Sequence, residues 1–442
     1  MRKILLAIAL LLSVTVANGQ PGYVPSQENL QARKEFSEAR FGIFIHWGIY
    51  SMIGNGEWIM EVSKISYEEY KHLAEGFYPS RFNADEWVKA FKAAGARYVT
   101  FTSRHHDGFS MFKTAQSTYN VVDGSPFGRD VVRELYDACQ KEGLKLNLYY
   151  SQLDWGRDDY YPLGDSGHSS GRTVKGDWKH YQDFMYAQLT ELLTQYPDLG
   201  AIWYDGMWDK QPEDRQEWKT IWDLDRQYEL IHRLQPSCLI GSNHHRQPFE
   251  GEDIQMFERD VPGETLNGYT DGQEVSALPL ETCQTIGFNW GYDISKNDKF
   301  KPASELIQLL ARTAGKGANL LLNIGPRPDG TIPEMCLDRL KAIGEWMDKY
   351  GDTIYGTQGG CIPAQSWGVT TQKDNKLYVH VLKHEDNIII PIKDNKLKSA
   401  VFFNGKGKVS ASQYKEGIVL TVPNTGSDEP DVVIELTFKN NL

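Results

Sequence analysis

The sequence predicts an α/β protein in which a (β/α)8-type barrel is followed by a small antiparallel β-sandwich. Short continuous apolar runs, typical of strands buried on both faces of a parallel sheet, alternate with amphipathic segments over most of the 442 residues. The apolar runs recur about every 40 residues, which is the rhythm of β–α units. After residue 355 the pattern changes to short alternating segments separated by turn residues.

Eight apolar runs supply the expected barrel strands. Each is short and is followed by polar or glycine-containing sequence, as strands of a (β/α)8 barrel are. The expected strands occupy residues 40–50, 96–106, 144–151, 200–206, 238–243, 253–258, 283–292 and 318–326.

Six segments predict the helices between and after these strands. The first begins with an Asn-x-x-Glu capping box, and the second ends at Gly143, a residue suited to a helix C-terminus. The six segments occupy residues 83–95, 128–143, 178–196, 217–235, 302–317 and 333–351. No clear helix separates the strands between residues 240 and 300, so we expect an irregular barrel there.

The two ends of the chain predict further parts. The segments NKLYVHVLK, NIIIPIK, SAVFFNG and EGIVLTV predict a β-sandwich over residues 356–442 that supports a catalytic barrel at 20–355. At the other end, Arg2 and Lys3 precede a short apolar run and a small-residue stretch, which predicts a signal peptide over residues 1–19. That apolar run is too short for a good membrane span. We therefore expect no membrane anchor and a secreted or periplasmic mature protein.

Composition excludes some classes of function. The formal net charge is -12 and the chain has no long basic run, so nucleic-acid binding is not expected. The five cysteines are widely spaced and form no CxxC pair. They are expected to be mostly buried free thiols rather than zinc ligands or disulfides.

Polar and aromatic residues gather where the predicted strands end. The active site of such a barrel lies at the C-terminal ends of its strands, so residues that follow different strands should meet. The blend of His, carboxylate and Trp there suits a neutral, polyhydroxylated ligand. These strand-end residues are His46 and Trp47, Arg104 to Gly108, Tyr149 to Ser151, Trp203 to Gly206, Asn243 to His245, Phe257 to Asp260, Phe288 to Trp290, and Asn323 to Pro326.

Histidines at these ends raise the possibility of a metal site. His105–His106 and His244–His245 are adjacent pairs, and neighbouring residues on a strand point to opposite faces. Each pair can therefore supply only one inward ligand, and no HExxH pattern is present. We expect no metal and no cofactor, and instead neutral imidazoles that donate hydrogen bonds to sugar hydroxyls.

One carboxylate stands out because it ends an aromatic strand. Asp205 follows Trp203 and Tyr204 and precedes Gly206, a residue that permits a tight turn. Asp205 could be a turn or helix-capping residue, or the nucleophile of a retaining glycosidase. A retaining enzyme needs a second carboxyl as acid/base. The spacing leaves that choice open among Glu258, Glu264, Glu274 and Glu281.

Several stretches resemble a known family. The motifs FGIFIHWGIYS, GEWIM, ARYVTFTSRHHDGFSMF, IWYDGMW, LPLETCQTIGFNWGY and NLLLNIGPRPDG occur in the order found in the alpha-L-fucosidases of glycoside hydrolase family 29. The resemblance covers roughly residues 25–355. It implies an exo-acting, retaining alpha-L-fucosidase that takes a fucosylated oligosaccharide or glycoconjugate as substrate.

The resemblance also implies roles for single residues. It puts the nucleophile on Asp205 and the acid/base on Glu264, with Glu258 as second choice and Glu281 as a structural residue. Trp290 or Phe288 is expected to face the fucose methyl group. The implied substrate-binding residues are His46, Glu57, Trp58, His105, His106, Tyr149, Trp203 and Arg259, to which we add Trp290 because the methyl group needs an apolar wall.

Three alternatives remain open at this point. They are an inactive sugar-binding relative of the same fold, another glycosidase activity on the same barrel, and a metallohydrolase that uses the histidine pairs. The polar loop at residues 154–177 is expected to border the site and to influence leaving-group preference.

Overall fold

A computed structural model describes residues 22–442 except 271–272, 297–298, 404, 406–408 and 424–428. The predicted signal peptide at residues 1–19 lies outside the described residues. Within the described part of the chain, none of the helices has the length and apolar character that crossing a membrane requires.

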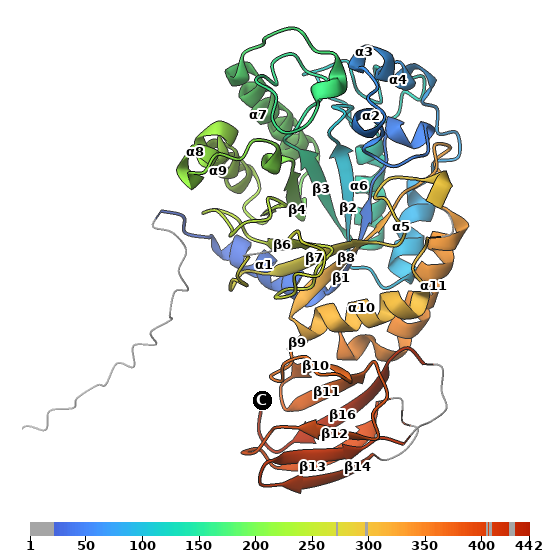
Figure 1. Ribbon diagram of the computed structural model, residues 1–442, viewed down its shortest axis with the longest axis vertical. Helices are drawn as coiled ribbons and strands as arrows, with labels where there is room; N and C mark the ends of the chain where they lie inside the picture. Colours follow the sequence, from blue (N-terminus) through green and yellow to red (C-terminus); the bar gives the residue numbers. More distant parts are fainter. Residues whose placement is uncertain (1–21, 271–272, 297–298, 404, 406–408, 424–428) are drawn as a thin grey trace, which may run out of the picture.

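Eight parallel strands form the barrel in the upper part of Figure 1. They run in the order β5-β4-β3-β2-β1-β8-β7-β6. The sheet is nearly closed, because a single parallel bridge between Gly241 and Ile254 spans the gap between β5 and β6. The strands are β1 (Phe41–Ile45), β2 (Tyr98–Arg104), β3 (Lys145–Ser151), β4 (Ala201–Asp205), β5 (Leu239–Ser242), β6 (Gln255–Glu258), β7 (Leu280–Thr285) and β8 (Ala318–Ile324).

In the described part of the chain, eight longer helices, α1 and α5 to α11, follow the barrel strands or close the barrel, and short helices lie in the loops (Figure 1). The α-helices are α1 (Gln27–Ala39), α2 (Ile59–Val62), α3 (Tyr67–Tyr70), α4 (Leu73–Gly76), α5 (Ala84–Ala93), α6 (Val131–Glu142), α7 (Trp178–Gln195), α8 (Arg215–Trp222), α9 (Leu224–Leu234), α10 (Ala303–Gly315) and α11 (Glu334–Tyr350). The 3-10 helices are η1 (Ile49–Met52), η2 (His168–Ser170), η3 (Met207–Asp209), η4 (Ile294–Lys296) and η5 (Gly351–Thr353).

The structure confirms the predicted irregularity and corrects two boundaries. Among the described residues, no helix lies between β5 and β6 or between β6 and β7. The seventh strand is Leu280–Thr285 rather than 283–292, so Trp290 belongs to the following loop. The single helix expected at 217–235 is divided into α8 and α9 at Asp223, whose φ of 52° is incompatible with a continuous helix.

Helix α1 covers the N-terminal end of the barrel. Its Phe36 packs on Tyr98 at the start of β2, with ring centroids 5.2 Å apart. Asn319 of β8 donates a 2.7 Å hydrogen bond to the Phe36 carbonyl, which holds the helix on the sheet. The active end of the barrel is therefore the opposite one, at the C-terminal ends of the strands.

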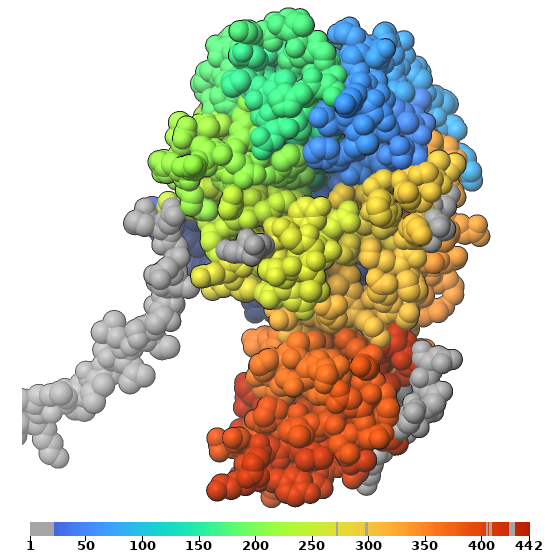
Figure 2. Space-filling view, viewed as in Figure 1, coloured from blue at the N-terminus to red at the C-terminus, as the bar shows by residue number. Residues whose placement is uncertain are grey.

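The C-terminal strands form a separate lobe below the barrel (Figure 2). One antiparallel sheet has the order β13-β16-β11-β10-β9, and the other has the order β12-β15-β14. Their facing sides share an apolar core that includes Leu377, Ile418 and Leu436. The strands are β9 (Gln358–Gly359), β10 (Gly368–Lys373), β11 (Lys376–Val381), β12 (Asn387–Ile390), β13 (Leu397–Phe402), β14 (Ser410–Tyr414), β15 (Gly417–Thr421) and β16 (Val432–Phe438).

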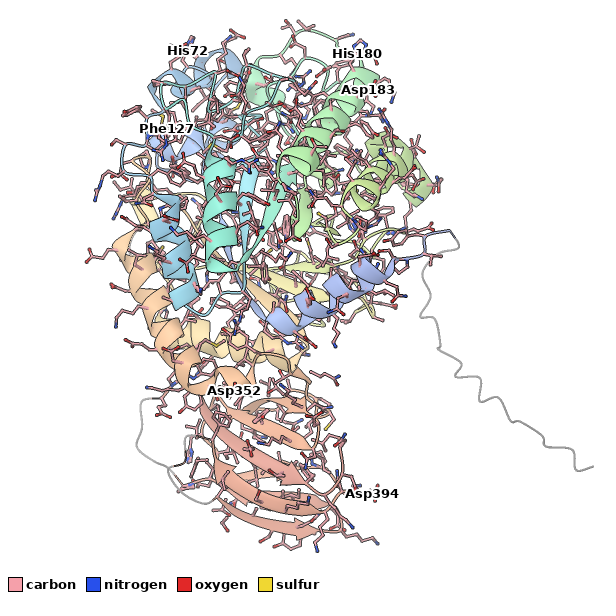
Figure 3. The ribbon with its side chains drawn as sticks, turned by 180° about the vertical axis from the view of Figure 1, so that it is seen from behind. His72, Phe127, His180, Asp183, Asp352 and Asp394 are labelled. Atoms are coloured by element: carbon pink, nitrogen blue, oxygen red, sulfur yellow. The ribbon has the colours of Figure 1, made fainter. Side chains whose placement is uncertain are left out.

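The two lobes meet beside α10 and the end of α11. Asp352, labelled in Figure 3, lies just after α11 where the chain passes toward the lower lobe. Gln308 of α10 donates hydrogen bonds to the carbonyls of Leu382 and Pro430, at 3.0 and 2.8 Å. All five cysteines are free thiols, four of them buried and Cys361 exposed.

Candidate active site

A cavity of about 510 Å³ opens at the C-terminal ends of the barrel strands. Every strand except β8 contributes lining residues, either from its end or from the loop that follows. The lining consists of Phe44, His46, Glu57, Trp58, His105, His106, Tyr149, Trp203, Asp205, Trp208, Gln211, Asn243, His245, Glu258, Arg259, Tyr269, Cys283 and Trp290.

Asp205 ends β4 in the wall of this cavity. Its Oδ2 accepts a 2.8 Å hydrogen bond from the Tyr149 hydroxyl, and its Oδ1 accepts a 3.0 Å bond from Trp208 Nε1. Burial raises the pKa of Asp205 to about 6, the negative charge of Glu258 adds to this, and the two hydrogen bonds partly offset it. The side chain is thus held on a rigid strand end and is ionised at neutral pH.

The turn after Asp205 depends on glycine. Gly206 has a φ of 91°, a region that residues with a Cβ rarely adopt. A Cβ at this position would lie 2.9 Å from the backbone nitrogen of Leu153 and closer still to its side chain. Backbone packing against Leu153 therefore fixes the direction in which the chain leaves the strand.

Three neutral histidines lie on the β1–β2 side of the cavity. Burial lowers the pKa of His46 to about 4 and lowers those of His105 and His106 well below the usual value. His46 stacks on Trp290 with ring centroids 5.3 Å apart, and His106 Nε2 lies 3.6 Å from Asp205 Oδ2. Imidazoles in this environment are uncharged at neutral pH and suited to hydroxyl groups.

The loop after β1 adds Glu57 and Trp58. Glu57 is buried and accepts a 2.7 Å hydrogen bond from the backbone nitrogen of Gly291. Burial raises its pKa. Trp58 stacks on Trp208 with centroids 5.6 Å apart, so two indoles form a continuous aromatic wall next to Asp205.

Trp203 is held in place by a carboxyl that lies inside the barrel. Its Nε1 donates a 2.8 Å hydrogen bond to Glu281, and the Tyr98 hydroxyl donates to the other oxygen of the same carboxyl at 2.5 Å. Glu281 lies within the barrel, and burial raises its pKa to about 7. It does not line the cavity.

Glu258, at the end of β6, is the second carboxyl that the structure brings into the cavity. Its Oε2 accepts a 2.8 Å hydrogen bond from Asn243 Nδ2 and lies 3.1 Å from His245 Nε2. Burial favours a higher pKa, but contacts with His245 and Asn243 and the nearby charge of Arg259 outweigh it and lower the pKa of Glu258. Arg259 itself lies over the Trp290 ring, 5.1 Å from its centroid.

The structure does not bring Glu264 to Asp205, which corrects the expectation for its position. Glu264 follows a turn in the loop after β6, and its carboxylate pairs with Arg312 of α10 at 2.6 Å. That ion pair directs the side chain toward the outer helix. Glu274, another candidate, is exposed and does not line the cavity either.

The remaining expectations have mixed outcomes. All nine predicted substrate-binding residues line the cavity. Phe288 is 54% exposed and lies outside the lining, so of the two proposed apolar walls only Trp290 faces the cavity. The loop at 154–177 does not line the cavity, but its Trp155 packs behind His106 with centroids 5.4 Å apart. Within the described residues, no group of three or more His, Cys, Asp or Glu side chains could hold a metal ion.

Comparison with known proteins agrees with this arrangement. Residues 10–352 match the family model described as Alpha-L-fucosidase. The chain belongs to the alpha-L-fucosidase family. An alpha-L-fucosidase of Dictyostelium discoideum is 28% identical over 95% of each chain. The solved alpha-L-fucosidase isoenzyme 1 from Paenibacillus thiaminolyticus is 32% identical, with a TM-score of 0.81, over 93% of this chain and all of that one.

A third relative bears on the mechanism of the family. The fucosidase from Bacteroides thetaiotaomicron is 25% identical, with a TM-score of 0.80, over 95% of this chain and 98% of that one. It was solved as a trapped covalent intermediate with 2-fluoro-fucosyl fluoride, in a variant carrying glutamine in place of a glutamate.

Sequence reasoning missed several lining residues of this fucosidase as site residues. Asn243 and His245 are among the strand-end residues of the fifth strand, but the sequence predicted no role for either of them. Trp208 lies in the short helix η3 and Gln211 and Tyr269 lie in loops, where no periodicity marks the direction of a side chain. Only the folded loops reveal that these residues face the cavity.

Proposed function

We propose that Asp205 is the nucleophile and Glu258 the acid/base with which this retaining alpha-L-fucosidase hydrolyses terminal alpha-L-fucose. The observation that carries the proposal is the shared amide of Asn243. Its Nδ2 lies 2.8 Å from Glu258 Oε2 and 3.5 Å from Asp205 Oδ1. The two carboxyls thus face one another across a single side chain.

This spacing suits retention. Glu258 Oε2 and Asp205 Oδ1 both contact Asn243 Nδ2, so the distance between these two oxygens cannot exceed the sum of their distances to that nitrogen. This maximum is shorter than the roughly 6.5 Å at which the carboxyl separations of inverting glycosidases begin. It is compatible with the ~5–5.5 Å between the carboxyls of retaining glycosidases. A separation in this range fits direct attack by a carboxylate on the sugar, as in a retaining enzyme, better than attack by a water that the carboxylate activates.

In the first step Asp205 Oδ attacks the anomeric carbon of fucose while the bond from that carbon to the leaving oxygen breaks. Glu258 gives its proton to the leaving oxygen, so the aglycone departs as a neutral alcohol. In the second step Glu258 removes a proton from water, whose oxygen displaces Asp205 and releases fucose with its original configuration.

The acid step needs a proton near Glu258 although the contacts of this residue lower its pKa. His245 supplies a place for that proton, because its Nε2 lies 3.1 Å from Glu258 Oε2. We place the acid proton on this contact, so that it moves from His245 through Glu258 to the leaving oxygen.

The other cavity residues are proposed to hold the sugar. His46, His105 and His106 face hydroxyls, Glu57 accepts from a hydroxyl, and the apolar face of Trp290 suits the methyl group that distinguishes fucose from hexoses with a hydroxymethyl group. Trp58, Tyr149, Trp203 and Arg259 complete the proposed contacts.

Replacing Asp205 with alanine tests the nucleophile. The change should lower kcat on an aryl alpha-L-fucoside by at least about 10³-fold, because no covalent intermediate can form. Added azide should restore turnover and yield the inverted beta-fucosyl azide, identified by NMR. Unchanged turnover, or an azide product of retained configuration, would contradict this role.

Replacing Glu258 and Glu264 separately with alanine tests the acid/base. Glu258→Ala should lower kcat/KM much more for a fucosyl disaccharide than for an activated aryl fucoside, because only the poor leaving group needs a proton. Azide should then yield the retained alpha-fucosyl azide. Glu264→Ala serves as the control and should keep near-normal turnover of the disaccharide; the reverse pattern would return the role to Glu264.

Export is a separate part of the proposal. We propose that residues 1–19 are a signal peptide and that the mature enzyme is secreted or periplasmic and acts on fucosylated glycans there. N-terminal sequencing of the protein from its native cells should begin near residue 20. An intact Met1 on the mature protein would argue against export by this route.

A further inference from the structure

The contacts behind two cavity histidines determine which ring nitrogen carries the proton. We infer that Ser151 and Asn323 are positioning residues that fix His106 and His46 as Nδ1–H tautomers. Both imidazoles then present an Nε2 lone pair to the cavity and accept hydrogen bonds from two hydroxyls of the sugar. This rests on the proposed function only in naming L-fucose as that sugar.

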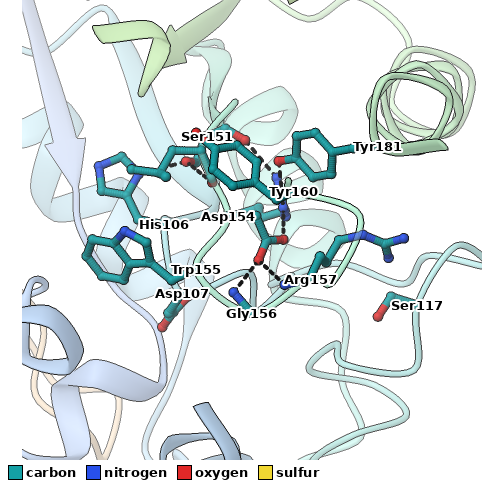
Figure 4. Close-up of polar contacts among 12 residues, drawn as sticks. His106, Asp107, Ser117, Ser151, Asp154, Trp155, Gly156, Arg157, Tyr160 and Tyr181 are labelled. Carbon is teal, nitrogen blue, oxygen red and sulfur yellow. Dashed lines mark hydrogen bonds and ion pairs between the residues drawn. The ribbon is translucent and has the colours of Figure 1, made fainter. Parts of the chain in front are cut away.

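The assignment for His106 follows from the hydroxyl of Ser151, which both Figure 4 and the distances place against the ring. Ser151 Oγ lies 2.7 Å from His106 Nδ1 and 2.6 Å from the carbonyl oxygen of Leu153. A serine hydroxyl has one hydrogen, and a carbonyl oxygen can only accept. The hydrogen therefore goes to Leu153, and Ser151 Oγ accepts from His106 Nδ1–H.

The assignment for His46 follows from the amide of Asn323. Its Nδ2 donates to the carbonyl oxygen of Trp290 at 2.7 Å and to Thr285 Oγ1 at 3.1 Å. The Trp290 carbonyl accepts only, so the amide nitrogen must face it. Asn323 Oδ1, 2.7 Å from His46 Nδ1, is then the acceptor, and His46 Nδ1 carries the hydrogen.

Both imidazole rings are uncharged at neutral pH. Burial lowers their pKa values, so each ring has a single N–H at neutral pH and Nε2 is unprotonated. The 3.6 Å from His106 Nε2 to Asp205 Oδ2 is too long for a hydrogen bond, as expected when two acceptors face each other. Sequence reasoning expected these imidazoles to donate, and the tautomers reverse that direction.

His105 provides a contrast within the same cavity. Its Nδ1 is buried and has no hydrogen-bond partner among the described residues. No neighbour therefore fixes a proton on that nitrogen, and the inference is restricted to His46 and His106.

A ligand must then offer two hydroxyl groups as donors. Fluorine can accept a weak hydrogen bond but cannot donate one. At a ring position that faces His46 or His106, replacing hydroxyl by fluorine should weaken binding as much as removing the oxygen altogether. We expect each such change to weaken binding about tenfold.

Imidazole ¹⁵N NMR of the full-length labelled protein near pH 7 tests the tautomers directly. His46 and His106, assigned from the signals missing in His46→Gln and His106→Gln, should both show Nδ1–H. Ser151→Ala should shift His106 to Nε2–H. Ser103→Ala is the matched control: its buried hydroxyl donates to the Tyr149 carbonyl at 2.7 Å, and its loss should leave both signals in place. An Nε2–H form of either ring in the unmodified protein overturns the inference.

Competitive inhibition by L-fucose and its monodeoxy and monodeoxyfluoro analogues tests the direction of the hydrogen bonds. At two of the three ring positions C2, C3 and C4, the fluoro analogue should bind as weakly as the deoxy analogue. In Ser151→Ala, the fluoro analogue at one of these positions should bind more tightly than the deoxy analogue, because His106 Nε2 then donates a hydrogen bond to the fluorine. Recovery of binding by fluorine at all three positions in the unmodified enzyme overturns the inference. If fucose itself does not bind, the sugar assignment fails while the NMR result still decides the tautomers.

Discussion

Asp205 shows how a single residue acquires its chemistry from its surroundings. The carboxylate lies among Tyr149, Trp208 and His106, and it is close enough to Glu258 for the two charges to interact. Burial and Glu258 raise its pKa, whereas the Tyr149 and Trp208 hydrogen bonds lower it. The balance leaves a carboxylate that is ionised at neutral pH but weakly solvated, which suits the proposed role of nucleophile.

The pH dependence of kcat/KM should report this balance. Asp205 must be ionised to act as the proposed nucleophile, so activity should fall as the pH drops through its pKa of about 6. Tyr149→Phe removes a hydrogen bond that stabilises the carboxylate and should raise that pKa by about 0.5–1. The acidic limb of the profile, measured on an aryl fucoside, should therefore move to higher pH.

Tyr150→Phe is the matched control for this profile. The Tyr150 hydroxyl donates to Gln188 rather than to Asp205, at 2.9 Å. Its removal should leave the acidic limb where it is. A Tyr149→Phe profile that falls in height without moving would mean that this hydroxyl does not stabilise the Asp205 carboxylate.

At the scale of elements, strand ends and the turns after them build the site. The 3-10 helix η3 begins directly after Gly206 and carries Trp208 back over Asp205. Two residues in the same cavity wall, His245 and Arg259, have positive φ values of 58° and 59°. Such backbone conformations are costly for these residue types and persist where the surrounding structure holds them.

Gly206→Ala should disrupt the turn that follows β4. The added Cβ would lie 2.9 Å from Leu153 N, and the φ of 91° is unfavourable for alanine. We expect a loss of about 1–3 kcal/mol in the free energy of unfolding. A fall of tenfold or more in kcat is expected as well, because η3 and Trp208 move relative to Asp205.

Gly143→Ala gives a comparison for backbone strain alone. Gly143 also has a positive φ, of 73°, but an added Cβ there has nothing within 4 Å and lies far from the cavity in the helix cap after α6. It should lower the free energy of unfolding, measured by urea titration, without lowering kcat. Equal losses of kcat in both variants would contradict the role given to the Gly206 turn.

The whole molecule combines a barrel that contains the cavity with a C-terminal lobe of two antiparallel sheets. The cavity opens at one end of the barrel, α1 covers the other end, and the C-terminal sheets lie beside α10 and α11 (Figures 1 and 3). No residue of the C-terminal lobe lines the cavity, within the parts of the chain that the structure describes. The lobe is therefore expected to act on stability rather than on the chemistry.

Gln308→Ala tests this division of roles. The change removes the two hydrogen bonds from α10 to the carbonyls of Leu382 and Pro430. We expect the free energy of unfolding to fall by about 1–3 kcal/mol, because two half-buried carbonyl oxygens lose their hydrogen-bond donor. The value of kcat/KM should stay within about twofold, since a loss of about 0.4 kcal/mol or less in transition-state stabilisation corresponds to that factor.

An exposed helical glutamine gives the control for this variant. Gln216→Ala on α8 removes a solvent-exposed side chain and should change the midpoint of thermal unfolding very little. A large fall in kcat/KM for Gln308→Ala, with stability unchanged, would mean that the lobe contact influences the active site.

The sequence by itself determined the barrel, the order of its parts and most of one cavity wall. Apolar runs and helical periodicity are local patterns, and the rule that strand ends meet converts them into neighbours in space. Asp205, His46 and Trp203 could be chosen in this way because each lies on or next to a strand. The irregular stretch between β5 and β7 was also predicted, because the sequence has no clear helical pattern there.

Only the tertiary structure decided which side chains from distant parts of the chain contact one another in the site. Glu258 and Glu264 are six positions apart and look equivalent in the sequence, but one faces Asn243 and the other pairs with Arg312 of α10. The proton positions of His46 and His106 depend on Asn323 and Ser151, which come from other strands. Such choices are set by long-range contacts, and residue spacing contains no information about them.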